Sequence, residues 1–101
     1  MENQIKELTL KQKIKILRSV RYKLKQGIVM QYMCILISDH KIVNKKYNRS
    51  ASTYTHILIP EFIRPVNTLK DSICWWANNN KGREKRIQYL NDLINKLEQK
   101  L

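Results

Sequence analysis

Apolar residues recur three or four positions apart near the start of the chain, which is the spacing of one face of a helix. This face carries Leu10, Ile14, Leu17, Val20 and Leu24. Thr9 and Gln12 have capping-box spacing in front of it, and Gly27 follows it where a left-handed C-cap residue is favoured. The pattern predicts a helix over residues 10–26.

A second amphipathic pattern runs to the last residue and predicts a helix over residues 82–100. Its seam consists of Ile87, Leu90, Ile94, Leu97 and Leu101, and Leu93 widens it. The two terminal helices are expected to pack on each other. Uncovered apolar surface costs about 25 cal/mol per Å². Because the chain is short, we expect a second copy to bury part of the seam, giving a homodimer or larger homo-oligomer.

The middle of the chain is less regular. The apolar run "IVMQYMCILI" is compatible with a buried strand or a buried helix, and its length with the residues that follow favours a helix over 28–46. Pro60 at a first helical turn predicts a short helix over 59–64, and residues 65–80 are expected to be a loop that carries a Trp pair. The fold class expected for residues 1–101 is a mostly α single domain: a small helical bundle with long N- and C-terminal amphipathic helices and an irregular middle.

Composition changes this picture because the chain is strongly basic. Lys and Arg number 20 against 8 acidic residues, which gives a net charge of +12. A compact state with so much like charge repels itself, and a bound anion would relieve the repulsion, so an anionic nucleotide or nucleic acid is the expected partner. The longest apolar run is ten residues, about half of a bilayer span, so no membrane partner is expected.

The basic residues are concentrated in the first predicted helix. Seven of them fall between positions 11 and 25, and no acid occurs from Leu8 to Ser38. A stripe about 80° wide, roughly opposite the apolar face, carries Lys11, Lys15, Arg18 and Lys25, with Tyr22 in its middle. Such a stripe is typical of a solvated surface and also of a face that binds a phosphate backbone. The missing acids favour binding.

A Trp pair and a cluster of cations meet in the stretch "ICWWANNNKGREKR", residues 73–86. Helix N-termini already carry positive potential, so cations there are unfavourable unless an anion binds. Adjacent side chains diverge, so one Trp is expected inside and the other available for stacking on a base, although both could simply cap a core. The predicted nucleotide pocket consists of Trp75, Trp76, Lys81, Arg83 and Arg86. Gly82 is expected to let the ligand approach the backbone.

The remaining reactive residue types predict no chemistry. Cys34 and Cys74 have no metal-ligand spacing and are expected to be reduced and mostly buried. Asp39, His40 and His56 lack a partner at catalytic spacing, and no phosphate-binding loop, dinucleotide fingerprint or zinc spacing occurs. We therefore expect no enzyme activity, no cofactor and no metal. The first ten residues lack the apolar core of a signal peptide, which favours the cytoplasm.

The order of these features resembles a group of small bacteriophage open reading frames. The resemblance rests on "LTLKQKIKILRSVRYKLKQG", a Cys-containing segment, "IPEF", the Trp pair and "RIQYLNDLINKLE", and it covers most of the chain. It implies a phage or prophage origin, action in the cytoplasm of a host bacterial cell, and an accessory role against host defence. It assigns no residue a function.

Three functions follow as hypotheses. The first is a non-enzymatic, phage-type protein that captures an anionic nucleotide signal in the Trp/Arg pocket. The second is a nucleic-acid-binding module that uses the basic stripe. The third is a basic inhibitor that docks on an acidic host protein. Salt dependence separates the first two, because a long phosphate track releases many counterions and a single nucleotide releases few.

Overall fold

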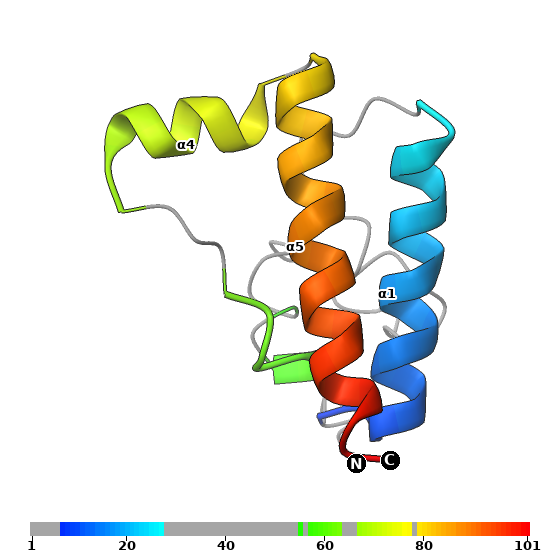
Figure 1. Cartoon of the computed structure of the whole chain (residues 1–101). Helices are drawn as coiled ribbons and strands as arrows, with labels where there is room; N and C mark the ends of the chain where they lie inside the picture. The colour runs from blue at the N-terminus through cyan, green and yellow to red at the C-terminus, as the bar shows by residue number, and fades with distance from the viewer. Residues whose placement is uncertain (1–6, 28–54, 56, 64–66, 78) are drawn as a thin grey trace, which may run out of the picture.

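The protein is mostly helical, which confirms the predicted fold class. The computed structural model describes residues 7–27, 55, 57–63, 67–77 and 79–101. Its long helices are α1 (Leu10–Lys25), α4 (Leu69–Trp76) and α5 (Asn80–Glu98), and no strand occurs in this part of the chain. Helices α1 and α5 lie side by side and run in opposite directions, while α4 extends away from the pair (Figure 1). The helix predicted over residues 28–46 lies outside the described residues.

Helix α1 has the ends that the sequence predicts. The Thr9 side chain accepts from the Gln12 backbone N–H at 3.3 Å, and Thr9 N donates to Gln12 Oε1 at 3.0 Å, so the capping box is present. Gly27 has φ +81°, the left-handed conformation that glycine adopts at low cost. The helix ends at Lys25, one residue before the predicted boundary.

Helix α5 begins at Asn80, two residues earlier than predicted, because Asn79 caps it. The Asn79 side chain accepts from Gly82 N at 2.9 Å. The predicted apolar seam is buried inside the single chain: Leu90, Ile94 and Leu97 are almost fully covered. Only the last member, Leu101, stays exposed. The seam therefore gives little reason for a second copy, and the homo-oligomer stays a prediction.

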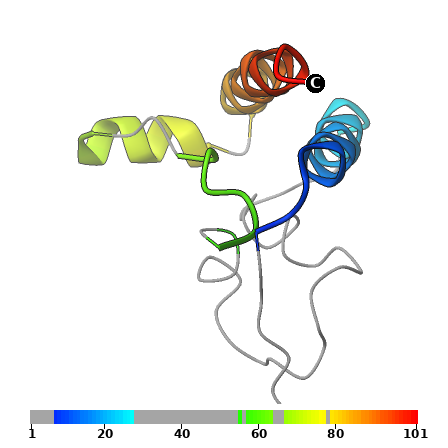
Figure 2. The ribbon, with the colours of Figure 1, turned by 90° about the horizontal axis from the view of Figure 1, so that it is seen from below.

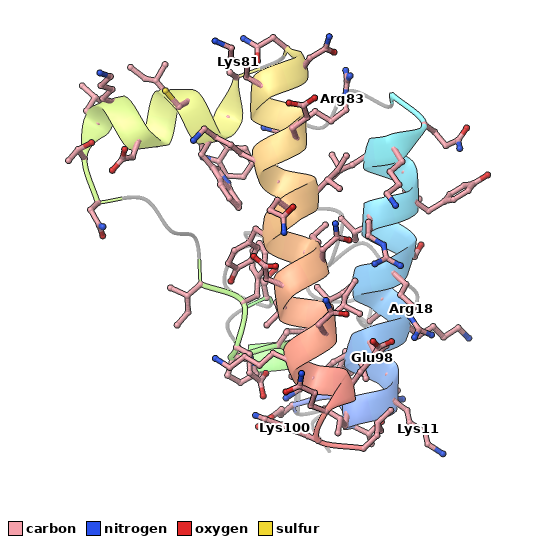
Figure 3. The ribbon with its side chains drawn as sticks, viewed as in Figure 1. Lys11, Arg18, Lys81, Arg83, Glu98 and Lys100 are labelled. Carbon is pink, nitrogen blue, oxygen red and sulfur yellow. The ribbon has the colours of Figure 1, made fainter. Side chains whose placement is uncertain are left out.

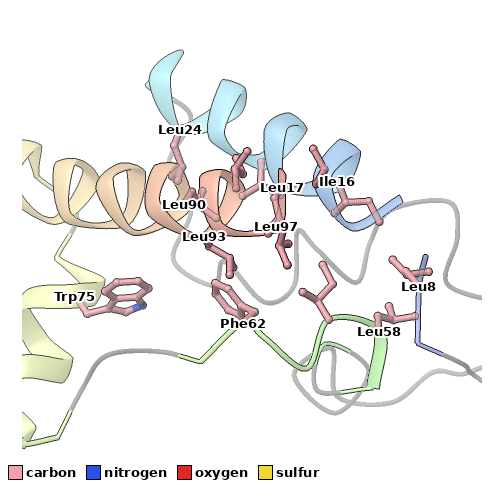
Figure 4. Packing of buried hydrophobic residues seen from close by; sticks show 14 residues of the cluster. Leu8, Ile16, Leu17, Leu24, Leu58, Phe62, Trp75, Leu90, Leu93 and Leu97 are labelled. Atoms are coloured by element: carbon pink, nitrogen blue, oxygen red, sulfur yellow. The ribbon is translucent and has the colours of Figure 1, made fainter. Parts of the chain in front are cut away.

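One core joins the terminal helices to two further segments. Figure 4 shows side chains of α1 and α5 meeting Leu8, Leu58, Phe62 and Trp75. A backbone hydrogen bond of 3.0 Å from Leu8 N to Leu58 O ties the segment before α1 to the segment around residue 58. Tyr89 lies between Phe62 and Trp75, with ring centroids 5.4 Å from each and edge-to-face geometry.

The loop predicted over 65–80 is wrong for half of its length, because Leu69–Trp76 form α4. The local signal was present in the sequence. The Thr68 hydroxyl accepts from Asp71 N at 3.0 Å, and Asp71 Oδ2 accepts from Asn67 N at 3.4 Å. Figures 1 and 2 show that only the C-terminal end of α4 reaches the bundle.

The outer face of α4 is exposed. Leu69 and Ile73, one turn apart, are 78% and 62% accessible to solvent. Cys74 is also exposed, so the expectation of a buried thiol is wrong for this residue. The other cysteine, Cys34, lies outside the described residues.

The short helix predicted over 59–64 is also wrong. Residues 57–58 are helical and residues 60–61 form a turn. Ile59 N donates to Thr55 O at 2.9 Å, and Phe62 N donates to Ile59 O at 3.0 Å. Pro60 has no N–H with which to continue the helical bonding, and it disfavours helical backbone at Ile59. It therefore ends a helical turn here instead of beginning one.

Candidate functional site

The predicted basic stripe is an exposed face of α1. Lys11, Lys15, Arg18, Tyr22 and Lys25 are all exposed. Helical geometry places them in one line because they are three or four residues apart, and the apolar face of the same helix is turned to the core. Tyr22 is 63% accessible, which is high for an aromatic side chain. We call these five residues the basic face.

Tertiary contacts supply acids to some cations of α1 and not to others. Arg18 forms an ion pair with Glu98 near the end of α5. Within the described part of the chain, Lys11, Lys15 and Lys25 have no carboxylate at ion-pair distance. The basic face therefore keeps three uncompensated positive charges along one side of a helix.

A hollow opens at the N-terminal end of the basic face. It has a volume of about 280 Å³ and is lined by Lys11, Ile14, Lys15, Arg18 and Leu101. Figure 3 shows Lys11, Arg18 and Glu98 at this end of the α1/α5 pair. Three cations thus surround a wall made of two apolar side chains. Sequence reasoning missed Ile14 and Leu101 as site residues because both belong to apolar seams and come from opposite ends of the chain.

The Trp pair divides as expected, with one ring inside and one partly accessible. Trp75 is 3% accessible, and Trp76 is half-buried. The two rings meet edge to face, with centroids 6.1 Å apart. Trp75 belongs to the core, so its ring offers no face to a ligand.

Arg86 is buried and forms hydrogen bonds within the protein. It is 3% accessible, and its guanidinium donates to Trp75 O and, at 3.4 Å, to Ala77 O. These carbonyls end α4, where the helix dipole is negative. Burial and then the nearby Arg83 charge lower the pKa of Arg86 below its ordinary value. The cation that the sequence assigned to a ligand thus binds the end of the preceding helix.

Gly82 has a similar explanation. A Cβ atom at this position would lie 2.2 Å from Ala77 O. The glycine lets the backbone after α4 approach α5 closely, and this approach brings the α4 carbonyls to Arg86. The structure gives Gly82 a packing role, so the predicted role in ligand approach is not needed to explain it.

The other two cations of the predicted pocket stay at the surface. Lys81 is exposed, and the partly buried Arg83 donates to Asn80 Oδ1 at 3.0 Å. Both lie at the opposite end of α5 from Glu98 (Figure 3). The structure therefore brings Arg86 next to Trp75 inside the protein, and leaves Lys81 and Arg83 outside.

Lys13 is a charged residue that sequence reasoning did not single out. Its side chain is 4% exposed, and its ammonium contacts Glu7 and, at 2.8 Å, Glu61 Oε1. Burial by itself would lower the pKa of Lys13, but the hydrogen bonds and charges of both carboxylates outweigh it, so the pKa is raised. Burial would raise the pKa of Glu61, and the Lys13 contacts outweigh it in turn, so that pKa is lowered.

The described residues contain no candidate metal centre and no helix that could cross a membrane. Among them, His, Cys, Asp and Glu side chains form no group of three that could hold a metal ion. None of the helices in this part of the chain has the length and hydropathy needed to cross a bilayer. Asp39, His40 and His56 lie outside the described residues. No protein-family model, curated protein or solved structure matches the chain.

Proposed function

We propose that this protein binds nucleic acid, without catalysis, through the basic face of α1. The observation that carries the proposal is the line of exposed cations, three of which have no acidic partner in the described part of the chain. Lys11, Lys15 and Lys25 can each neutralise a phosphate, Arg18 can do so where a phosphate replaces Glu98, and the release of counterions then drives binding. The net charge of +12 adds long-range attraction to a polyanion.

The nucleotide pocket at the Trp pair has less support. Trp75 is covered by the core, and Arg86 already binds two carbonyls, so neither is available without a change in the fold. Lys81, Arg83 and the partly accessible Trp76 are the members that a nucleotide could still reach. Capture of a nucleotide signal there stays a prediction.

The test compares two variants of equal charge. The first changes Lys11, Lys15, Arg18 and Lys25 to Gln. The control changes Lys23, Lys70, Lys85 and Lys96, which are exposed elsewhere, to Gln. Binding to labelled DNA is measured by fluorescence anisotropy over a series of salt concentrations. On duplex DNA, the wild-type slope of log K against log salt is expected to be about −2.7 to −3.6 for three to four phosphate contacts.

The basic-face variant should lose binding, and the control should keep most of the affinity and the same slope. Loss of the Arg18–Glu98 pair costs only about 0–1 kcal/mol, so the fold should persist in the basic-face variant, as far-UV circular dichroism can check. Equal losses in both variants would show that net charge alone attracts DNA, and the proposal would be wrong. A wild-type protein that binds an acidic protein but no nucleic acid would favour the inhibitor hypothesis instead.

The proposed binding activity is compatible with an accessory role in a phage-infected cell. A small basic protein could act there on host or phage nucleic acid, in line with the anti-defence role that the resemblance implies. This biological role is part of the proposal, and the binding experiment tests its physical basis.

A further inference from the structure

The basic face is more than a row of charges. Tyr22 stands between Arg18 and Lys25 with 63% of its surface accessible, although it has no place in the core. At the other end of the face, the hollow has apolar lining that comes mainly from Leu101, which is 68% accessible, while Ile14 beneath it is a core residue with 4% of its surface accessible. The exposed side chains of Leu101 and Tyr22 therefore lie among the cations of the basic face.

A duplex exposes no base faces that could contact these apolar and aromatic side chains. The outside of a double helix presents phosphates and sugars, whereas its base faces are stacked inside. Unpaired bases expose their π-faces, and proteins that bind single strands combine a basic track with aromatic stacking platforms. The mixture of surfaces on α1 fits the second kind of ligand.

The spacing along the helix assigns the two apolar surfaces to different nucleotides. Ile14 and Tyr22 are eight residues apart, which is about 12 Å along the axis at 1.5 Å per residue. This separation is several times the rise of about 3.4 Å between stacked bases of one strand, so a single base cannot touch both. Lys11, Lys15 and Arg18 surround the hollow and can hold the phosphates next to a base placed there.

We propose that the basic face takes a single strand of nucleic acid, with one unpaired base in the hollow against the exposed Leu101 side chain and another stacked on Tyr22. This inference rests on the proposed function and specifies its ligand. The cations supply affinity for the backbone, and the two apolar surfaces supply the preference for unpaired bases.

The experiment compares a short labelled oligothymidine with a duplex of the same length at matched salt. Wild-type protein is expected to bind the single strand more tightly. Tyr22→Ala should weaken single-strand binding by about 5- to 150-fold, the range for loss of one stacked base, and should weaken duplex binding clearly less, with both salt slopes kept because no charge is removed. Tyr22→Phe keeps the ring and should keep the affinity. An oligouridine arm shows whether the strand preferred is DNA or RNA.

Two further variants separate stacking from charge. Leu101→Ser removes an exposed apolar wall without changing charge, and should weaken only the single strand. Lys11→Gln combined with Lys15→Gln should weaken both ligands and reduce the single-strand salt slope by about 1.4, which is 0.7 for each of two phosphates.

The outcomes distinguish this inference from the function on which it rests. If single strand and duplex bind equally, or if Tyr22→Ala has no effect on the single strand, the inference is overturned while backbone binding stands. If neither ligand binds, the proposed function fails and the inference fails with it. Because Tyr22 is an exposed residue outside the core, Tyr22→Ala should leave the far-UV circular dichroism spectrum and the melting temperature unchanged.

Discussion

Loss of Glu61 should destabilise the protein more than loss of its partner Lys13. The Lys13 side chain is 4% exposed, whereas Glu61 and Glu7 are 28% and 55% exposed. Glu61→Gln leaves a buried ammonium whose remaining carboxylate, Glu7, is largely in water. Lys13→Met removes the buried charge, fills much of the same space, and leaves two carboxylates that water can reach.

The magnitudes follow from these exposures. Removing one partner of a fully buried ion pair costs about 3–5 kcal/mol. Because Glu7 remains, we expect about 2–3 kcal/mol for Glu61→Gln. For Lys13→Met we expect about 1 kcal/mol or less, since the carboxylates left behind are partly hydrated. In a domain of this size, 1 kcal/mol corresponds to a shift of about 4–8 °C in melting temperature.

Urea denaturation at neutral pH measures the difference, provided that the m-values agree among the variants. The double variant Lys13→Met/Glu61→Gln should be about as stable as Lys13→Met alone. Once the Lys13 ammonium is gone, the Glu61 carboxylate has no ion-pair partner, so changing it to an amide removes no interaction. If Lys13→Met costs as much as Glu61→Gln, packing of the Lys stem and not the buried charge governs this site, and the reasoning is refuted.

The same contact predicts a pH dependence. The folded pKa of Glu61 lies below its ordinary value of 4.5, so the unfolded chain binds a proton more readily there. The stabilisation is present above that ordinary value and is lost as the pH falls through the lower, folded value. Wild-type protein should lose more stability on acidification than Glu61→Gln. For Lys13 the folded pKa is raised above 10.5, so its contribution is complete below that pH and is lost only as the pH rises through the folded pKa.

Two further predictions concern the junction of α4 and α5. Trp75→Ala should lower the free energy of unfolding by about 3–5 kcal/mol, and Trp76→Ala should lower it clearly less, because only Trp75 is fully buried. Thermal melting measures both changes, and equal losses of stability would contradict this assignment. Gly82→Ala should cost about 1–3 kcal/mol in urea denaturation, because its Cβ would meet Ala77 O, whereas the exposed Asn95→Ala on the same helix should stay within about 0.5 kcal/mol. A Gly82 variant as stable as the Asn95 variant would show that the close approach is not needed.

Most of the candidate site could be predicted from helix geometry. The basic face of α1 was predictable because its members are neighbours on one helix, and the spacing of three or four residues fixes that relation locally. The hollow could not be predicted, because it needs Leu101 to lie beside Ile14. Sequence patterns also left Lys13 out of the basic stripe but did not show that it is buried against Glu61, because that contact spans 48 residues.

The sequence by itself determined the two terminal helices, the capped start of the first at Thr9, and the faces that both helices bury. These features depend on contacts within about four residues along the chain, so local patterns contain them. Tertiary structure alone decided which charged side chains are buried and bound to partners within the protein. Lys13 meets Glu61 across 48 residues, and Arg86 binds carbonyls at the end of α4. Charges that look equivalent in sequence differ in burial because burial depends on which distant segments pack against them.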